Sequence, residues 1–341
     1  MRVLITGGCG FAGSHLVEHL LATTNWRLTV LDGLTYAGRV DRLTDMAGYD
    51  PDRVQVLWHD LRAPIRGHLD DAIGTVDSVL HLAASTHVDR AIADPRPFVL
   101  NNITGALTML QWARSRDLTH FVQISTDEVY GPAAPGHAHA EWEAQLPSNP
   151  YSASKAGVEA LAIAWWRTYG IPVVITNTMN LFGERQHPEK FVPKVISLAL
   201  AGEKIPLHAR PQRAGRMEYG YRWEPSSRHW LHARNHADAL RWILAETTPA
   251  VYAEGADRPD RWHVAGQERN VMELANQIVR VLGTTADFEM IDYHGQRPGH
   301  DHRYALNAGK IAAAGWKPPV ELDESLARTV GWYQRNLSWL R

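Results

Sequence analysis

Tyr151 and Lys155 place a phenol and an ammonium four residues apart. On a helix this spacing puts both side chains on one face. An ammonium beside a phenol stabilises the phenolate and moves the phenol pKa from ~10 toward neutrality. The pair is therefore suited to take the proton of a substrate hydroxyl.

Two adjacent carboxylic acids, Asp127 and Glu128, follow Thr126. The predicted strand Phe121–Ser125 ends just before Thr126, so the two acids lie at the end of this strand. Neighbouring carboxyl groups in different environments can divide the roles of general acid and general base. The elements around them must bring this pair to the same place as Tyr151.

A glycine-rich turn lies near the N-terminus, where Gly7, Gly10 and Gly13 follow the predicted strand Val3–Thr6. Gly7 permits a tight turn, Gly10 the close approach of a pyrophosphate, and Gly13 tight packing of a helix on the strand. The N-terminus of the following helix, Ala12–Ala22, would face the phosphates. The pattern indicates a dinucleotide site.

Asp32 ends the next predicted strand, where a carboxylate can accept hydrogen bonds from both hydroxyls of a ribose. Gly33 follows it, and no Arg stands there to receive a 2′-phosphate. We therefore expect the cofactor to be NAD rather than NADP. Cys9, inside the turn, is interpreted as a small filler.

The first half of the chain alternates short β-branched apolar runs with longer amphipathic stretches. Runs that are apolar on both faces are typical of buried parallel strands in a doubly wound α/β sheet, here a Rossmann sheet. The predicted strands are Val3–Thr6, Leu28–Leu31, Val54–Leu57, Ser78–Leu82, Phe121–Ser125 and Val173–Thr176. The predicted helices are Ala12–Ala22, Pro97–Arg114 and Ser152–Tyr169.

The length of 341 residues exceeds the ~250–300 at which a single core usually stops growing, so two lobes are expected. We predict an NAD-binding Rossmann domain over residues 1–178, to which the chain returns around 230–265. A smaller, interleaved substrate-binding lobe takes most of residues 179–341. A composition of 45% apolar and 21% charged residues excludes a largely disordered chain.

The net charge of −2 gives no electrostatic footprint for nucleic acid or an anionic membrane. No stretch approaches the ~20 consecutive apolar residues of a membrane span, and the first residues lack the layout of a signal peptide. A single cysteine, Cys9, excludes an internal disulfide and fits a reducing compartment. We expect a cytoplasmic protein.

Taken together, the motifs resemble the extended short-chain dehydrogenase/reductase family, and within it the dTDP-glucose 4,6-dehydratases. The similarity runs nearly from end to end. The segments that carry it are Gly7–Gly13, Asp32–Gly38, Leu82–Arg90, Ser125–Gly131, Tyr151–Lys155, His187–Lys190, Arg228–Trp230 and Arg297–Asp301.

The resemblance implies an NAD-dependent hydro-lyase acting on a nucleoside diphosphate hexose. Such an enzyme oxidises C4, eliminates water across C5–C6 and returns the hydride to C6, which gives a 4-keto-6-deoxy sugar. Tyr151 and Lys155 would serve the oxidation, and Thr126 would hydrogen-bond the C4 hydroxyl. Asp127 would be the acid for the departing oxygen and Glu128 the base for the C5 proton.

Binding residues follow from motif position in the same family. A nucleoside diphosphate carries about two negative charges, so cations and amide donors are expected around it. The expected cofactor residues are Gly7, Gly10, Phe11, Ala12, Gly13, Asp32, Leu34, Thr35, Asp60, Leu61, Leu82, Ala83, Ala84, Asn101, Tyr151 and Lys155. The expected substrate residues are Thr86, Thr126, Asn180, Lys190, Phe191, Pro206, His208, Arg228, Asn270, Arg297, His300 and Asp301.

The chain departs from the family pattern in several places. An expanded, Arg-rich segment occupies His208–Ser227, with His208 where a tyrosine is expected. Ser85 replaces a glutamate, and Leu181 replaces a second asparagine beside Asn180. These departures leave open the base (thymine, uracil, guanine or cytosine) and the hexose. The segment is either a solvated insertion or part of the nucleotide site.

Two other functions fit parts of the pattern. Nucleotide-sugar epimerases and decarboxylases also use a Tyr and NAD, but they need not expel water, and Asp127 argues against them. A non-catalytic dinucleotide sensor would have no reason to combine Thr126, Tyr151 and Lys155.

Neither a metal site nor a monomer is expected. The histidines at 137, 139, 294, 300 and 302 lack cysteine partners and helical His-x-x-x-His spacing. The helices Pro97–Arg114 and Ser152–Tyr169 are apolar over wider arcs than one sheet face requires, as Ala160–Trp166 shows. In the resembling family these helices pair across a two-fold axis, which predicts a homodimer.

Overall fold

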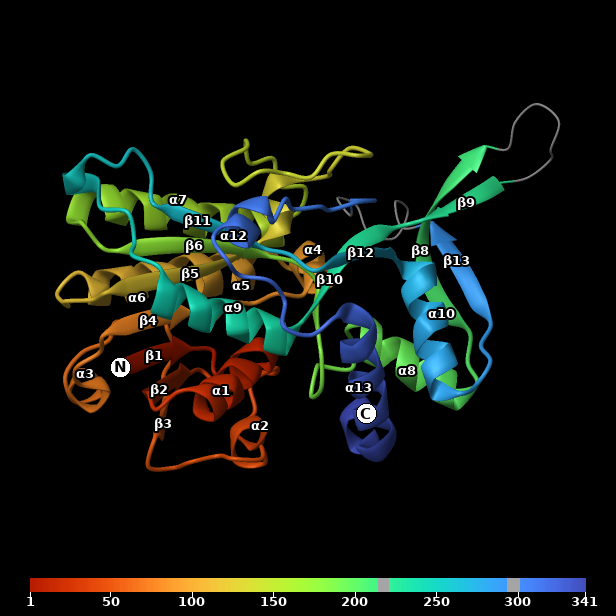
Figure 1. Ribbon diagram of the computed structural model, residues 1–341, viewed down its shortest axis with the longest axis horizontal. Helices are drawn as coiled ribbons and strands as arrows, with labels where there is room; N and C mark the ends of the chain where they lie inside the picture. Colours follow the sequence, from red (N-terminus) through yellow and green to blue (C-terminus); the bar gives the residue numbers. More distant parts are fainter. Residues whose placement is uncertain (214–220, 293–300) are drawn as a thin grey trace.

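A parallel sheet of seven strands forms the centre of the larger lobe (Figure 1), in a computed structural model that describes residues 1–213, 221–292 and 301–341. The strand order is β11-β6-β5-β4-β1-β2-β3, so the chain starts in the middle, winds to one edge and then builds the other. The strands are β1 (Arg2–Thr6), β2 (Arg27–Asp32), β3 (Val54–Trp58), β4 (Ser78–His81), β5 (His120–Thr126), β6 (Val173–Thr178) and β11 (Asp260–Val264).

Helices cover both faces of this sheet and form a separate buried core with each. One layer contains α1 (Phe11–Thr23), α2 (Asp41–Thr44) and α9 (Ala233–Glu246). The other contains α3 (His68–Ile73), α6 (Gly105–Ala113) and α7 (Pro150–Tyr169). The connection from β4 to α6 runs through α4 (Val88–Ala93), α5 (Arg96–Phe98) and a π-helical turn, η1 (Val99–Thr104). Burial on both faces explains why the strands are apolar throughout.

Most of the chain after β6 builds a smaller lobe with its own core. Within the described residues it has two three-stranded sheets, β12-β10-β7 and β13-β8-β9, against which α8, α10 and α13 pack. The β8–β9 hairpin extends away from the rest of the molecule at the upper right of Figure 1. The strands are β7 (Leu181–Phe182), β8 (Ile205–Arg213), β9 (Tyr221–Pro225), β10 (Ser227–His232), β12 (Gln267–Asn270) and β13 (Phe288–Asp292). Its helices are α8 (Phe191–Ala201), α10 (Val271–Leu282) and α13 (Leu322–Arg335), with the short turn η4 (Leu337–Leu340). The short helix α12 (Gly309–Ala313) packs instead in the core of the large sheet, and the turn η3 (Tyr252–Glu254) packs against Trp166 of α7.

The chain crosses between the lobes more than once. After β10, α9 packs beside α1, and β11 pairs in parallel with β6 at the edge of the large sheet. Both elements lie in the segment 230–265. The division into domains at residue 178 stays a prediction.

The predicted α/β doubly wound fold is confirmed. All six predicted strands are present, with ends that differ by at most two residues. The helix predicted over Pro97–Arg114 is α5, η1 and α6 in succession. In the described part of the chain, no helix has both the length and the apolar character needed to cross a membrane.

The start of α7 is fixed by a capping box. The Asn149 side chain accepts the Ser152 N–H at 3.0 Å, and the Ser152 hydroxyl accepts the Asn149 N–H at 3.1 Å. Pro150 fits the first turn because no helical partner exists there for an N–H. Tyr151 is thereby held in the first turn of the helix.

Candidate active site

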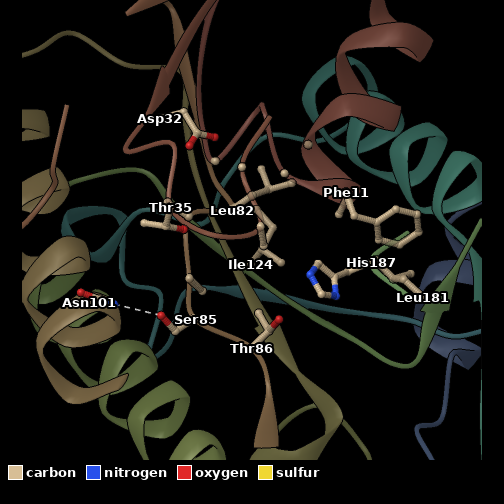
Figure 2. Close-up of a pocket in the computed structure, with 18 of the residues that line it drawn as sticks. Phe11, Asp32, Thr35, Leu82, Ser85, Thr86, Asn101, Ile124, Leu181 and His187 are labelled. Atoms are coloured by element: carbon tan, nitrogen blue, oxygen red, sulfur yellow. Dashed lines mark hydrogen bonds between the residues drawn. The ribbon is translucent and has the colours of Figure 1, made fainter. Parts of the chain in front are cut away.

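A cleft of about 770 Å³ lies at the carboxyl ends of the parallel strands and is lined by both lobes. Ligands bind at this edge in doubly wound sheets. Figure 2 shows Asp32, Thr35 and Leu82 on one part of its wall, and Phe11, Leu181 and His187 on another. The volume is within the ~300–1,000 Å³ usual for small-molecule sites.

Gly7 and Gly13 in the turn after β1 leave no room for a side chain. A Cβ on Gly13 would lie 2.2 Å from the Gly7 carbonyl oxygen. A Cβ on Gly7, whose φ is +72°, would lie 2.8 Å from the Ala83 Cα. Gly10 lines the cleft, and a Cβ there would meet only the Gly7 oxygen, at 3.1 Å. Its open side and the N-terminus of α1 make a cradle that fits a pyrophosphate.

Asp32 faces the cleft from the end of β2 (Figure 2). Its carboxylate accepts the N–H groups of Cys9 at 2.9 Å and Leu34 at 2.8 Å, which fixes its orientation. Burial raises its pKa, and these two hydrogen bonds oppose the shift. Gly33 lines the cleft next to it, so this corner can accept ribose hydroxyls and would repel a 2′-phosphate.

The predicted cofactor residues converge on this cleft, with the exception of Leu34. Leu34 has a positive φ of 47° and contributes the backbone N–H that orients Asp32. The predicted cofactor residues that line the cleft are Gly7, Gly10, Phe11, Ala12, Gly13, Asp32, Thr35, Asp60, Leu61, Leu82, Ala83, Ala84, Asn101, Tyr151 and Lys155.

Asp127 and Glu128 have different surroundings at the end of β5. Asp127 is buried, its Oδ1 accepts the Thr126 hydroxyl at 3.0 Å, and its Oδ2 has no partner among the described residues. Burial, and after it repulsion by Glu128, raises the pKa of Asp127 to about 7. Glu128 accepts Asn149 Nδ2 at 2.9 Å, and burial also raises its pKa. The raised pKa suits Asp127 to be an acid, whereas the Asn149 hydrogen bond and the charges of Arg228 and Lys190 favour the carboxylate form of Glu128 against the effect of burial.

Lys155 reaches the cleft from α7, with its ammonium directed at β5. It donates to the Ile124 carbonyl oxygen at 2.6 Å. Burial lowers its pKa to about 8, and the charge of Glu159 opposes that shift.

The expected lowering of the Tyr151 pKa is wrong for this structure. Burial raises the pKa of Tyr151, the carboxyl groups of Glu128 and Asp127 add to the shift, and a hydrogen bond with Thr126 opposes it. The sequence showed the nearby ammonium but not the burial of the phenol. The phenol therefore needs a further positive charge before it can act as a base.

Four of the predicted substrate residues line the cleft: Thr86, Thr126, Asn180 and Lys190. Arg297 and His300 lie outside the described residues. The remainder do not line it: Phe191, Pro206, His208, Arg228, Asn270 and Asp301. Their roles stay predictions.

Arg228 and Asn270 have structural contacts of their own. The Arg228 guanidinium donates to the carbonyl oxygens of Ser227 and His302 at 2.6 and 2.7 Å, and its charge lowers the pKa values of the neighbouring acid pair. The Asn270 side chain accepts the Glu273 N–H at 2.8 Å and so caps α10.

Sequence reasoning missed several residues of this cleft. The Tyr36 hydroxyl donates to Glu189 at 3.4 Å, and both residues lie in motifs already quoted, so they could have been found. Ser85, at a position where the sequence departs from the family, accepts Asn101 Nδ2 at 3.0 Å (Figure 2). Trp58 is 67% exposed at the end of β3 and had no sequence signal.

Tyr304 is a further residue that the sequence analysis passed over. Its hydroxyl donates to Glu128 at 3.5 Å, and its ring lies 4.7 Å from the Arg228 guanidinium. It follows the Arg297–Asp301 motif by three residues, which was the one available signal.

One group of possible metal ligands occurs among the described residues: His137, His139 and Glu143. Both imidazoles contact the same carboxylate oxygen, at 3.0 and 2.7 Å. These are hydrogen-bond distances, so the cluster is accounted for without an ion. It does not line the cleft.

Comparison with known proteins shows the family. The model described as GDP-mannose 4,6 dehydratase matches residues 4–329. The chain is 37% identical to the low-salt glycan biosynthesis protein Agl12 of Haloferax volcanii, with 98% of each chain covered. It is 36% identical to the dTDP-glucose 4,6-dehydratase of Streptomyces niveus, with 99% of this chain and 94% of that one covered. The structure of the dTDP-glucose 4,6-dehydratase DesIV from Streptomyces venezuelae, with NAD and TYD bound, has a TM-score of 0.83 and 35% identity, covering 99% and 98% of the two chains.

The fold, the glycine turn and the Tyr–Lys pair make this protein an extended short-chain dehydrogenase/reductase. Within that class the chain belongs to the GDP-mannose 4,6 dehydratase family. The predictions of NAD as the cofactor and of a nucleotide-sugar 4,6-dehydratase are confirmed.

Proposed function

We propose that this dehydratase acts on dTDP-glucose and that Thr126, Asp127, Glu128, Tyr151 and Lys155 carry its chemistry. The observation that supports the proposal most is the pair formed by the buried Asp127 and the partly buried Glu128, which faces the same cleft as Tyr151. The choice of dTDP-glucose rests on the names of relatives near 35% identity, whereas the family model is described by GDP-mannose. The base therefore needs a direct test.

In the first step Tyr151 takes the proton of the C4 hydroxyl, which Thr126 orients. Bound NAD supplies the hydride acceptor and a positive charge that counteracts the raised pKa of the phenol. Lys155 adds a second positive charge to the same cleft. Fixed charges of this kind stabilise a developing anion where water is excluded.

In the elimination Glu128 takes the C5 proton and Asp127 gives a proton to the departing C6 hydroxyl. The pKa of about 7 keeps much of Asp127 protonated at neutral pH, and its unpartnered Oδ2 is free to meet that hydroxyl. Glu128 later returns its proton to C5. Tyr151 has then gained the proton that Asp127 lost, and Thr126, which hydrogen-bonds both, offers a path between them.

The test is incubation of the purified protein with dTDP-, UDP-, GDP- and CDP-hexoses, followed by mass spectrometry. Loss of one water from dTDP-glucose in preference to the other nucleotides is the expected result. Loss of water from another nucleotide sugar instead would show that this sugar, and not dTDP-glucose, is the substrate. An unchanged mass with an inverted C4 would make the protein an epimerase.

We further propose that the protein is a cytoplasmic homodimer. Its single cysteine, Cys9, is buried, and burial raises the pKa of the thiol to about 12, so it offers no reactive thiolate. The dimer would pair through η1, α6 and α7.

A further inference from the structure

A buried ion pair lies behind the catalytic strand. Glu159 on α7 and Arg261 on β11 are 0% and 2% exposed, and Glu159 Oε2 lies 2.7 Å from Arg261 NH2. Gln145 donates to the same carboxylate oxygen at 2.5 Å. Removing two charges from water is costly, and a buried ion pair is weak evidence for stability by itself. The role of the Glu159–Arg261 ion pair must therefore be inferred from its other contacts.

Asn177 on β6 connects the ion pair to the catalytic strand. Asn177 Nδ2 donates to Glu159 Oε1 at 2.8 Å and to the Thr126 carbonyl oxygen at 2.9 Å. Both hydrogens of this amide have an acceptor, so its orientation is fixed. Asp127 and Glu128 follow Thr126 directly, so Glu159 is tied to the strand end that carries them.

The same carboxylate acts on the helix that carries Tyr151 and Lys155. Glu159 follows Lys155 by four residues, which places both on one face of α7. The Glu159 charge favours the protonated form of Lys155 against the effect of burial. Arg261, in contact with Glu159, supplies the opposing charge.

The other titratable groups packed around Lys155 do not replace Glu159 in this role. His81 on β4 is buried, and its pKa is lowered to about 3, so it is neutral at working pH. Tyr151 on α7 and the acid pair on the turn η2 (Asp127–Tyr130) belong to the chemistry itself.

We propose that Glu159 is a positioning residue with two effects. It holds the Thr126 strand end in register with α7, and with Arg261 it sets the electric field at Lys155. The proposal deepens the proposed function and rests on it, because it requires Lys155 to serve the oxidation of C4.

The test compares Glu159→Gln with Arg261→Met, both in an Asp127→Asn parent so that Asp127 does not titrate. The pH dependence of C4 oxidation is followed by the absorbance of the reduced cofactor. The alkaline limb is the fall in the rate of C4 oxidation at high pH, where Lys155 loses its proton. Glu159→Gln leaves the Arg261 cation unopposed, so Lys155 loses its proton more easily and this limb moves to lower pH. Arg261→Met leaves the carboxylate unopposed and moves the limb to higher pH. Shifts of about one pH unit are expected.

The double variant, Glu159→Gln with Arg261→Met, should restore the limb toward that of the parent. Two losses of rate with no movement of the limb, or movement in the same direction, would overturn the proposal. A pair with only a structural role predicts that pattern. Glu324→Gln, which breaks an exposed ion pair with Arg328 on α13, is the matched control and should leave the limb in place.

If Glu159→Gln does not fold, two other variants still test whether Glu159 acts as a positioning residue. Glu159→Asp keeps the charge and should lower the rate without moving the limb, while Arg261→Met must still raise it. A limb that stays in place in Arg261→Met overturns the proposal. If the Asp127→Asn parent forms no reduced cofactor with dTDP-glucose, the proposed function fails instead.

Discussion

Asp127 shows how much of the proposed chemistry depends on the environment of one side chain. An exposed aspartate is ionised at neutral pH and cannot give a proton to a leaving hydroxyl. Burial and the neighbouring Glu128 raise the Asp127 pKa to about 7, which makes it an acid under working conditions.

Substitutions should separate the oxidation from the elimination. Asp127→Asn and Glu128→Gln remove the acid or base of elimination, so turnover should fall ~10²–10⁴-fold. C4 oxidation continues in these variants, and reduced cofactor should accumulate on the enzyme, measured by its absorbance. Tyr151→Phe blocks the first step and should show neither turnover nor absorbance. Near-normal turnover in Asp127→Asn would favour an epimerase or decarboxylase.

Asp127→Asn should also gain stability at alkaline pH. The folded-state pKa of about 7 exceeds the ordinary value of 3.8, so the wild type loses stability as pH rises through this window. An amide has no such ionisation. Thermal unfolding should therefore give the variant the higher Tm at about pH 8, with a smaller difference at about pH 4. An equal difference at both pH values would show that the carboxyl ionisation is not the cause.

At the level of elements, the β1–turn–α1 unit makes a strict structural demand on the sequence. In Gly13→Ala the new Cβ would lie 2.2 Å from the Gly7 oxygen, so the turn must open. The variant should be purified with little bound nucleotide, measured after denaturation. Gly331→Ala on α13, where the nearest atom would be 3.5 Å away on a flexible Arg335 side chain, is the control. Full cofactor retention in Gly13→Ala would contradict the assigned role of the turn.

The end of β2 predicts the identity of that nucleotide. Asp32 holds its carboxylate on two backbone N–H groups, and Gly33 offers no cation for a 2′-phosphate. Nucleotide released from the wild type should therefore be NAD. Recovery of mainly NADP would refute this interpretation of the β2 end.

The large sheet could be predicted from the sequence because parallel strands buried on both faces appear as apolar runs. The helix over Pro97–Arg114 was predicted as one element, and its π-helical turn η1 was not seen. A single π-helical turn hardly changes the spacing of apolar residues. The mixed sheets of the smaller lobe are irregular, and no regular spacing of apolar residues in the sequence predicts their strands.

The candidate site was predictable where one motif supplies several residues, as Gly7–Gly13 does. It was not predictable where distant segments meet. Tyr304 reaches Glu128 across 176 positions of the chain, and Glu159 meets Arg261 through folding alone. The predicted lowering of the Tyr151 pKa was wrong for the same reason, because burial depends on packing and not on the spacing of residues in the sequence.

For the molecule as a whole, large apolar side chains are exposed on η1 and at the end of α7. Val99 and Leu100 on η1 are 46% and 43% exposed, and Tyr169 at the end of α7 is 42% exposed. Leu161 and Ile163 on α7 are only partly buried. Exposed apolar side chains of this kind suit an isologous contact, in which the same surface of two copies meets.

We therefore expect light scattering at micromolar concentration to give the mass of a dimer. Leu100→Glu places a charge in the proposed contact and should shift the mass to that of a monomer, because an unpaired buried charge is strongly disfavoured. Leu200→Glu, on α8 in the smaller lobe, changes a side chain of similar exposure, 45%, and should leave the dimer intact. Since no residue of the cleft lies on η1 apart from Asn101, the monomer should still bind NAD. A monomeric wild type would refute the proposed dimer. A dimer that persists in Leu100→Glu but dissociates in Leu200→Glu would place the contact elsewhere.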